Sequence, residues 1–206
     1  TDEKNGTYAP ELTHALHEFL EAGFDYDIAS IKGGTAPLYG EEEKDTVNQA
    51  ILADDDFQSR INNTIPATQV SASDYDAVFY PGGFGLLSDL AENTTVAKIT
   101  ADLYEAGKVV GSVCHGPAGL LPIKLSDGTA LLAGKQVTAF THEEEKDYGT
   151  INKIPFLLEE AVTRKAGLYS KVAPWLENVV TDGTLVTGQN PASAHGVGKA
   201  MVSLMK

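Results

Sequence analysis

The sequence predicts an α/β fold in which a doubly wound, mostly parallel sheet is sandwiched by helices. Apolar stretches of strand length alternate with amphipathic stretches of helix length along the chain. Short glycine-marked connections join them, and this alternation is typical of parallel strands linked by crossover helices. The third observation is the run V-V-G-S-V-C-H-G-P-A-G at 109–119. It joins a β-branched strand to a small-residue turn, the pattern of a nucleophile elbow, with Cys114 at the turn.

Composition limits the class of protein. The 206 residues fit one domain, 1–206, with no repeat or linker. A net charge of −14 argues against nucleic acid or an anionic membrane as partner. No apolar run approaches the roughly 20 residues that a membrane-spanning helix needs. The single cysteine allows no internal disulfide, and the first residues lack signal-peptide character, so we expect a cytoplasmic protein.

The first half of the chain predicts helices, strands and turns in alternation. Residues 11–22 repeat apolar side chains at helical spacing and stop at Gly23, and 95–106 do the same before Gly107. A less certain helix at 50–61 is interrupted by Asp54–Asp56. Further elements are strands at 24–29 and 76–80, a turn at 30–34 and a solvated acidic rim at 41–45.

The second half predicts the rest of the sheet. After the strand at 109–113 we expect a helix that begins beneath Cys114, and Pro191 should begin the last helix, with Ala194, Val197, Met201 and Leu204 on its buried side. The other elements are a polar turn at 124–129, a strand at 136–140, a helix at 154–165 and paired strands at 178–182 and 184–187.

A glycine loop follows the strand at 76–80. Pro81-Gly82-Gly83 is the kind of loop that lets backbone amides approach a ligand. A phosphate-binding loop is the alternative, but the downstream Gly-Lys-Ser/Thr that it requires is missing.

Cys114 combines the features of a reactive thiol. A helix N-terminus, backbone donors and the adjacent His115 imidazole all favour a thiolate, so we predict a pKa below the roughly 8.5 of a free thiol. The alternative is a buried cysteine that acts as a small hydrophobe. The His-Gly-Pro that follows is not needed by a core strand and favours the first interpretation.

Four motifs together resemble the ThiJ/PfpI family. They are C-H-G-P-A at 114–118, P-G-G-F-G at 81–85, F-T-H-E-E-E at 140–145 and T-G-Q-N-P-A-S at 187–193. They look most like the longer subgroup that holds glutathione-independent glyoxalase III and heat-shock-type chaperones. The resemblance implies a flavodoxin-like, class I glutamine amidotransferase-like domain and a homodimer as a candidate assembly.

Two positions depart from the family pattern. Such proteins have a buried strand ahead of the helix that carries Glu11, so we expect the first strand to be missing from the sequence as given. Phe84 stands where many glyoxalase-type relatives have histidine. This second departure puts the polar contacts on the substrate side in doubt.

The resemblance also implies roles for particular residues. Cys114 would be the nucleophile and His115 the base, oriented by a carboxylate in the acidic run at 140–145. The family position falls on Glu145, with Glu144 as its nearest competitor and a solvated acidic turn as the alternative for the whole run.

Two further roles complete this set. Glu11 matches the family's helix-borne glutamate beside the cysteine and would move protons, although a glutamate at a helix start also simply favours the helix dipole. The backbone N–H groups of Gly83 and His115 would bind the oxyanion.

The implied activity is a cofactor-independent, glyoxalase III-like lyase, also described as D-lactate dehydratase-like, that turns methylglyoxal and water into lactate. Its partner would be a small 2-oxoaldehyde, and deglycase activity would be the same chemistry. The alternatives are a stress chaperone or redox sensor with an oxidisable cysteine, and a cysteine peptidase or amidase. Zinc held by His14, His17 and a carboxylate is conceivable, but such histidines are also ordinary surface residues, and we predict no metal.

Overall fold

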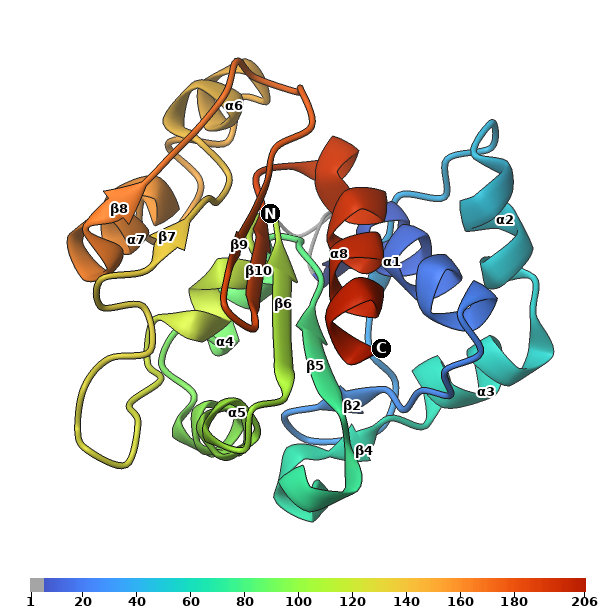
Figure 1. The fold of residues 1–206 in the computed structure, drawn as a ribbon. Coiled ribbons are helices and arrows are strands. Elements are labelled where there is room, and N and C mark those ends of the chain that lie inside the picture. The colour runs from blue at the N-terminus through green and yellow to red at the C-terminus, as the bar shows by residue number, and fades with distance from the viewer. Residues whose placement is uncertain (1–5) are drawn as a thin grey trace.

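The computed structural model describes residues 6–206, drawn in Figure 1. The strands are β1 Thr7–Tyr8, β2 Ala29–Ser30, β3 Leu38–Tyr39, β4 Ile65–Pro66, β5 Ala77–Tyr80, β6 Val109–Val113, β7 Gln136–Val137, β8 Leu168–Tyr169, β9 Val179–Asp182 and β10 Leu185–Gly188. The α-helices are α1 Ala9–Glu21, α2 Thr46–Leu52, α3 Asp55–Asn62, α4 Gly85–Asp89, α5 Thr94–Glu105, α6 His142–Asp147, α7 Leu158–Ala166 and α8 Ala194–Met205. Short 3₁₀ helices are η1 Ala67–Gln69, η2 Ala72–Asp74, η3 Gly116–Leu120 and η4 Pro191–Ser193.

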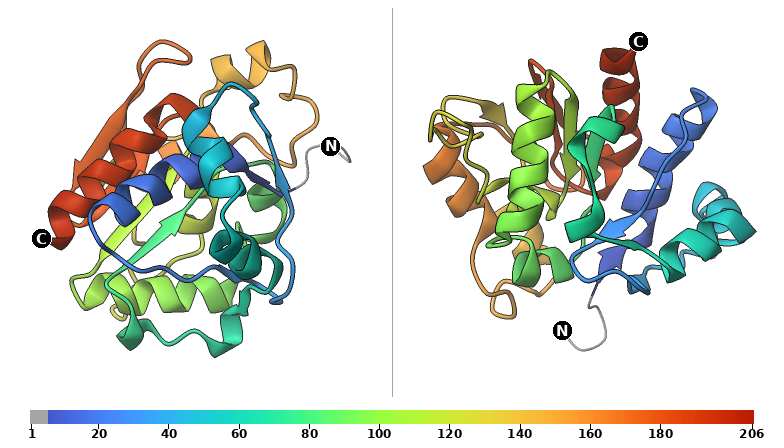
Figure 2. Two further views of the ribbon diagram at one scale, coloured as in Figure 1. Left: turned by 90° about the vertical axis from the view of Figure 1, so that its right-hand side faces the viewer. Right: turned by 90° about the horizontal axis from the view of Figure 1, so that it is seen from below.

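The main sheet has the strand order β5-β6-β10-β9. β6 pairs in parallel with both β5 and β10, and β9 joins β10 as an antiparallel edge strand. Helix α5 covers one face, and α8 with α1 covers the other, as the view from below in Figure 2 shows. Three two-stranded parallel pairs, β1-β3, β2-β4 and β7-β8, complete the strands. The predicted doubly wound, mostly parallel fold is confirmed.

β6 lies at the centre of the packing. All five of its residues are buried, and its side chains alternate between two core clusters on opposite faces of the sheet. Val110 faces the cluster with α5, whereas Val109 and Val113 face α8. Gly111 lies on the α8 side, where an added Cβ would overlap the Met201 sulfur. The missing side chain therefore lets α8 pack closely on the strand that ends at Cys114.

Two predicted strands are shorter than the sequence suggests. Of the 24–29 region only Ala29 pairs with β4, together with the next residue, Ser30, and of the 136–140 region only residues 136–137 pair, with β8. Ladder length depends on the neighbour and not only on the pattern of the strand itself. Beyond β7 the backbone bonds elsewhere, since the Thr138 amide donates to the Thr187 hydroxyl at 3.0 Å.

Three helix predictions also need correction. The 50–61 region is two helices, because the Asp54 carboxylate accepts the Phe57 amide at 2.8 Å and so caps a new helix. The helix expected from 154 begins at Leu158. Leu204, expected on the buried side of the last helix, is 40% exposed.

Two predicted helices and four predicted strands are confirmed within two residues at each end. The helices are 11–22 and 95–106, and the strands are 76–80, 109–113, 178–182 and 184–187. β1 immediately precedes α1 and pairs with β3. Among residues 6–206, no helix has both the length and the apolar character needed to cross a membrane.

Candidate active site

Cys114 occupies the predicted elbow. Its φ of 59° is in the left-handed region that side chains rarely adopt, immediately after β6. Two hydrogen bonds hold it there: the Cys114 amide donates to the Gly188 carbonyl at 2.9 Å, and the Phe140 amide donates to the Cys114 carbonyl at 3.0 Å. Gly116 is required next, because an added Cβ would overlap the carbonyl oxygen of Tyr80. The strain is therefore imposed by neighbouring strands and loops.

The predicted lowering of the thiol pKa is wrong. Burial raises the pKa of Cys114 well above its ordinary value, and the nearby Glu11 carboxylate raises it further, whereas the His115 amide only partly opposes this. The segment after the elbow is the five-residue 3₁₀ helix η3 and not a long α-helix, so the dipole that the sequence argument relied on is small.

Glu11 approaches the thiol from the first turn of α1 and is fully buried. Burial raises its pKa from 4.5 to about 8, although the Cys114 thiol and the Gly82 amide are near enough to favour the anion slightly. Neither meets hydrogen-bond geometry, so within residues 6–206 both carboxyl oxygens lack a partner. Glu11 is therefore mostly protonated at neutral pH, and the neighbouring Cys114 thiol, whose pKa is also raised, keeps its own proton.

Gly82 makes this approach of Glu11 to the cysteine sterically possible. An added Cβ at Gly82 would overlap the Glu11 carboxyl oxygen and lie 2.7 Å from the Cys114 Cβ. The glycine loop predicted to admit a ligand thus admits a side chain of the protein itself.

His115 connects the thiol to Glu145. Its Nδ1 is 3.3 Å from the Cys114 sulfur, and its Nε2 is 2.6 Å from Oε1 of Glu145. The Thr150 hydroxyl donates to the other oxygen of Glu145. A carboxylate at Nε2 favours the proton on that nitrogen, which leaves Nδ1 free to accept the thiol proton. The structure thus connects Cys114, His115 and Glu145 in one chain of contacts.

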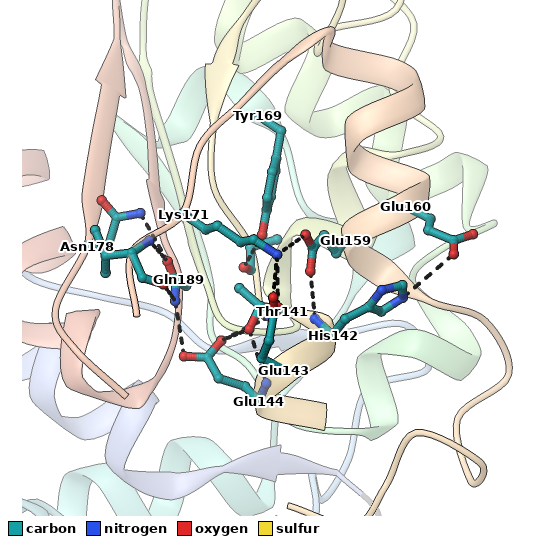
Figure 3. Close-up of polar contacts among 12 residues, drawn as sticks. Thr141, His142, Glu143, Glu144, Glu159, Glu160, Tyr169, Lys171, Asn178 and Gln189 are labelled. Atoms are coloured by element: carbon teal, nitrogen blue, oxygen red, sulfur yellow. Dashed lines mark hydrogen bonds and ion pairs between the residues drawn. The ribbon is translucent and has the colours of Figure 1, made fainter. Parts of the chain in front are cut away.

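Glu144 lies next to Glu145 but faces away from the imidazole. It is fully buried, and Figure 3 shows it at the centre of a polar network. Its oxygens accept hydrogen bonds from the Trp175 amide (2.9 Å), Gln189 Nε2 (3.1 Å), Asn190 Nδ2 (2.8 Å), the Thr141 amide (2.9 Å) and the Thr141 hydroxyl (2.8 Å). The alternative of a solvated acidic turn is wrong, because α6 carries two buried carboxylates.

The 187–193 motif supplies much of this network. Gln189 also donates to the Val172 carbonyl (3.2 Å), and the Ser193 hydroxyl accepts the Asn178 amide (3.0 Å). These residues tie the loop that follows β8 to the end of β10. The motif therefore has a structural role that the sequence did not reveal.

Aromatic side chains surround the imidazole, and sequence reasoning missed all but Phe84. The centroid of the Phe84 ring is 4.8 Å from that of the His115 ring, and the centroid of the Phe140 ring is 4.6 Å from it. Tyr39 stacks on Phe84 at 6.4 Å, and burial, with Cys114 and Glu11 nearby, raises its pKa. In the sequence these residues are scattered over a hundred positions, so no spacing indicated them.

Of the two predicted oxyanion donors, the structure puts one next to the thiol. The His115 amide faces the Cys114 sulfur, where it favours the anion. Gly83 has a φ of 123°, and an added Cβ there would overlap the Gly6 carbonyl oxygen. Their role in binding an oxyanion stays a prediction.

The histidines considered for zinc have other contacts. His14 Nε2 is 2.6 Å from Asp45 Oδ2, and the His14 ring stacks on His195 at 4.4 Å. His17 meets the same ring edge-on at 6.1 Å. In the described part of the chain, no group of three or more His, Cys, Asp or Glu side chains could hold a metal ion.

Comparisons with known proteins agree on one family. A model of the DJ-1/PfpI family matches residues 4–204. "Glutathione-independent glyoxalase HSP31" of Saccharomyces cerevisiae is 34% identical, over 98% of this chain and 90% of its own length. The solved structure of Francisella tularensis Rapid Encystment Protein 24 KDa superposes with a TM-score of 0.95 at 32% identity, over 100% of this chain and 92% of that one. Glyoxalase III from Candida albicans gives 0.89 at 26% identity, over 100% and 91%.

Proposed function

Since the chain belongs to the DJ-1/PfpI family, we propose that it is a glutathione-independent glyoxalase that converts methylglyoxal and water into lactate without a cofactor. The observation that carries the proposal is the buried chain of contacts from Cys114 through His115 to Glu145, with the protonated Glu11 also next to the thiol. The names of the relatives in Saccharomyces and Candida support the same activity.

The reaction begins at the sulfur. His115 Nδ1 takes the thiol proton, and the thiolate adds to the aldehyde carbon to give a hemithioacetal. The imidazolium that forms is stabilised by Glu145, which holds Nε2. Amides of Gly83 and His115 stabilise the oxygen that becomes negative.

The next step needs a proton acceptor between the two carbons of the hemithioacetal. Glu11 first gives its proton to the oxygen that addition of the thiolate made negative, and so becomes a carboxylate. The carboxylate then takes the proton from the former aldehyde carbon and returns it to the neighbouring carbon, while the hydroxyl proton moves from the first oxygen to the second, which leaves a thioester of the 2-hydroxy acid. Water then releases lactate and regenerates the thiol. A carboxyl with a pKa of about 8 suits this role, because it can both give and take a proton near neutral pH.

The proposal also includes a substrate class and a cellular location. The substrate class is a small 2-oxoaldehyde, and the lone buried cysteine suits a cytoplasmic location. A peptidase or amidase would need Cys114 and His115 but has no step that moves a proton between carbons, so Glu11 distinguishes the two activities.

The test is lactate formation from methylglyoxal by the purified protein in the absence of glutathione. Cys114→Ser should abolish it. Glu11→Gln should lower it about a hundredfold or more while Cys114 still reacts with iodoacetamide. Glu21→Gln, on the exposed end of the same helix, is the matched control. No lactate from the unmodified protein would end the proposal in favour of a redox or chaperone role, and a full rate for Glu11→Gln would assign the proton to His115 alone.

A further inference from the structure

A closed circuit of rings extends from the imidazole to the protein surface. His115 lies between Phe84 and Phe140. From Phe84 the circuit continues to Tyr148 at 5.9 Å, nearly parallel, and from Phe140 to Trp175 at 5.7 Å, edge-on. Tyr148 and Trp175 are 6.2 Å apart and close it. We call Phe84, Phe140, Tyr148 and Trp175 the aromatic wall.

The two ends of the aromatic wall differ in exposure. Phe140 is buried against the imidazole, whereas Tyr148 and Trp175 are 43% and 40% exposed. Two large rings that stay partly in water contribute less hydrophobic stabilisation than buried rings would, so burial in the core does not explain where they lie. An aromatic group bound at 4.5 to 7 Å from these rings would supply the missing hydrophobic contact.

Trp175 is also held in a strained backbone conformation. Its φ is 66°, a left-handed value that a bulky residue adopts only when its surroundings enforce it. The Trp175 amide donates to Glu144 Oε1 at 2.9 Å, and Asn190 Nδ2 donates to the Leu176 carbonyl at 2.8 Å. Glycine would fit this position without strain. The fold therefore spends stability to keep an indole where it meets Phe140 and Tyr148.

The same short helix positions both the base His115 and the aromatic wall. On α6, Glu145 holds His115 and Glu144 holds the Trp175 amide. The distance from the reacting sulfur to the rings is thus fixed through adjacent residues of one rigid element.

From these contacts we infer that the site selects 2-oxoaldehydes with an aromatic substituent over methylglyoxal, with Trp175 as the specificity-determining residue. The inference rests on the proposed glyoxalase function. The reaction stays the same: an arylglyoxal and water give a 2-hydroxy-2-arylacetate, with the aryl group against the aromatic wall. A methyl group is too small to contact rings on both sides.

Steady-state kinetics with phenylglyoxal and methylglyoxal test the inference. The unmodified protein should have the higher kcat/KM for phenylglyoxal. Trp175→Ala should lower that value about tenfold and leave kcat/KM for methylglyoxal within about twofold. Trp175→Phe should retain most of the preference. Leu176→Ala, at the more exposed next residue, is the matched control and should change neither value.

Trp175→Gly separates specificity from folding. Because glycine relieves the positive φ, this variant should melt no lower than the unmodified protein and still lose the preference for phenylglyoxal. Equal losses for both aldehydes, or unchanged kinetics in Trp175→Ala, would overturn the inference while leaving the glyoxalase function standing.

Binding gives a readout that does not depend on turnover. Trp175 is the single tryptophan of the chain, so its fluorescence reports on the wall directly. Mandelate should quench it at concentrations about tenfold below those needed for lactate. Equal or absent quenching by the two acids would refute the inference. If neither aldehyde yields a hydroxy acid but mandelate still binds preferentially, the glyoxalase function fails and the aromatic preference of the wall stands.

Discussion

Removing the ionisable group of Glu11 should change how stability depends on pH. The carboxyl is fully buried and its pKa is raised from 4.5 to about 8. Between these values the unfolded chain loses the proton and the folded protein keeps it, so the free energy of unfolding falls as pH rises. Stability is thus fully present below pH 4.5 and lost as pH rises toward 8.

The size of this loss follows from the same two values. At about 1.4 kcal/mol for each pH unit, the raised pKa costs about 5 kcal/mol once both states are ionised. From pH 5 to pH 8 the loss is about 3.5 kcal/mol, or roughly 10 °C in Tm for a chain of this size. Glu11→Gln cannot ionise, so its unfolding free energy should lack this part of the pH dependence.

Urea unfolding at several pH values from 5 to 8 measures the difference. Glu21→Gln serves as control, and Cys114→Ser as a common background removes the thiol, whose pKa is raised in part by Glu11. The difference in unfolding free energy between Glu11→Gln and its parent should grow with pH in favour of the glutamine. A difference that stays constant across the range would refute the raised pKa, because burial of an amide has a cost independent of pH.

Three further predictions follow from the site. Glu145→Gln should lower lactate formation at least about tenfold, while its free energy of unfolding stays within about 1 kcal/mol of the unmodified protein. Glu144→Gln should lower the free energy of unfolding by about 2 kcal/mol, because its new amide group faces hydrogen-bond donors. Equal urea midpoints for the two variants would contradict this. The rate of Cys114 alkylation by iodoacetamide should inflect at a pH above the free-thiol value, and Glu11→Gln should lower the inflection; an inflection below it in the unmodified protein would disprove the raised pKa. Gly82→Ala should abolish activity by displacing Glu11 from the thiol, and an active, folded variant would show that this contact is dispensable.

The elements that could be predicted from sequence are those with a local physical cause. The strand that runs from Val109 toward Cys114 was predicted because a strand buried on both faces has a continuous apolar sequence. The elbow was predicted because only small residues allow the turn after it. β2 and β7 were overestimated since their lengths depend on partners, β4 and β8, that lie more than 30 residues away.

The sequence indicated which residues lie at the site, but it did not indicate the direction of the pKa shift of the thiol. Cys114 was indicated by the strand-turn pattern, the roles of His115 and Glu11 came from the family resemblance, and the structure brings the three together. The direction of the thiol pKa was wrong because a motif shows neighbours in sequence and not the depth of burial. The aromatic wall was missed for the same reason, since Phe140 and Trp175 meet only through folding.

The ambiguity between Glu144 and Glu145 has a geometric solution. Successive residues on a helix point about 100° apart, so neighbouring side chains on α6 cannot share one target. One carboxylate turns to the imidazole, and the other turns to the Trp175 amide and the end of β10. Both are buried and both are needed, which is why the acidic run is a helix with a capping box and not a solvated turn. A shift of this helix would therefore move the base and the aromatic wall together, so variants that loosen α6 should lose rate and selectivity in parallel, whereas Trp175→Ala loses selectivity alone.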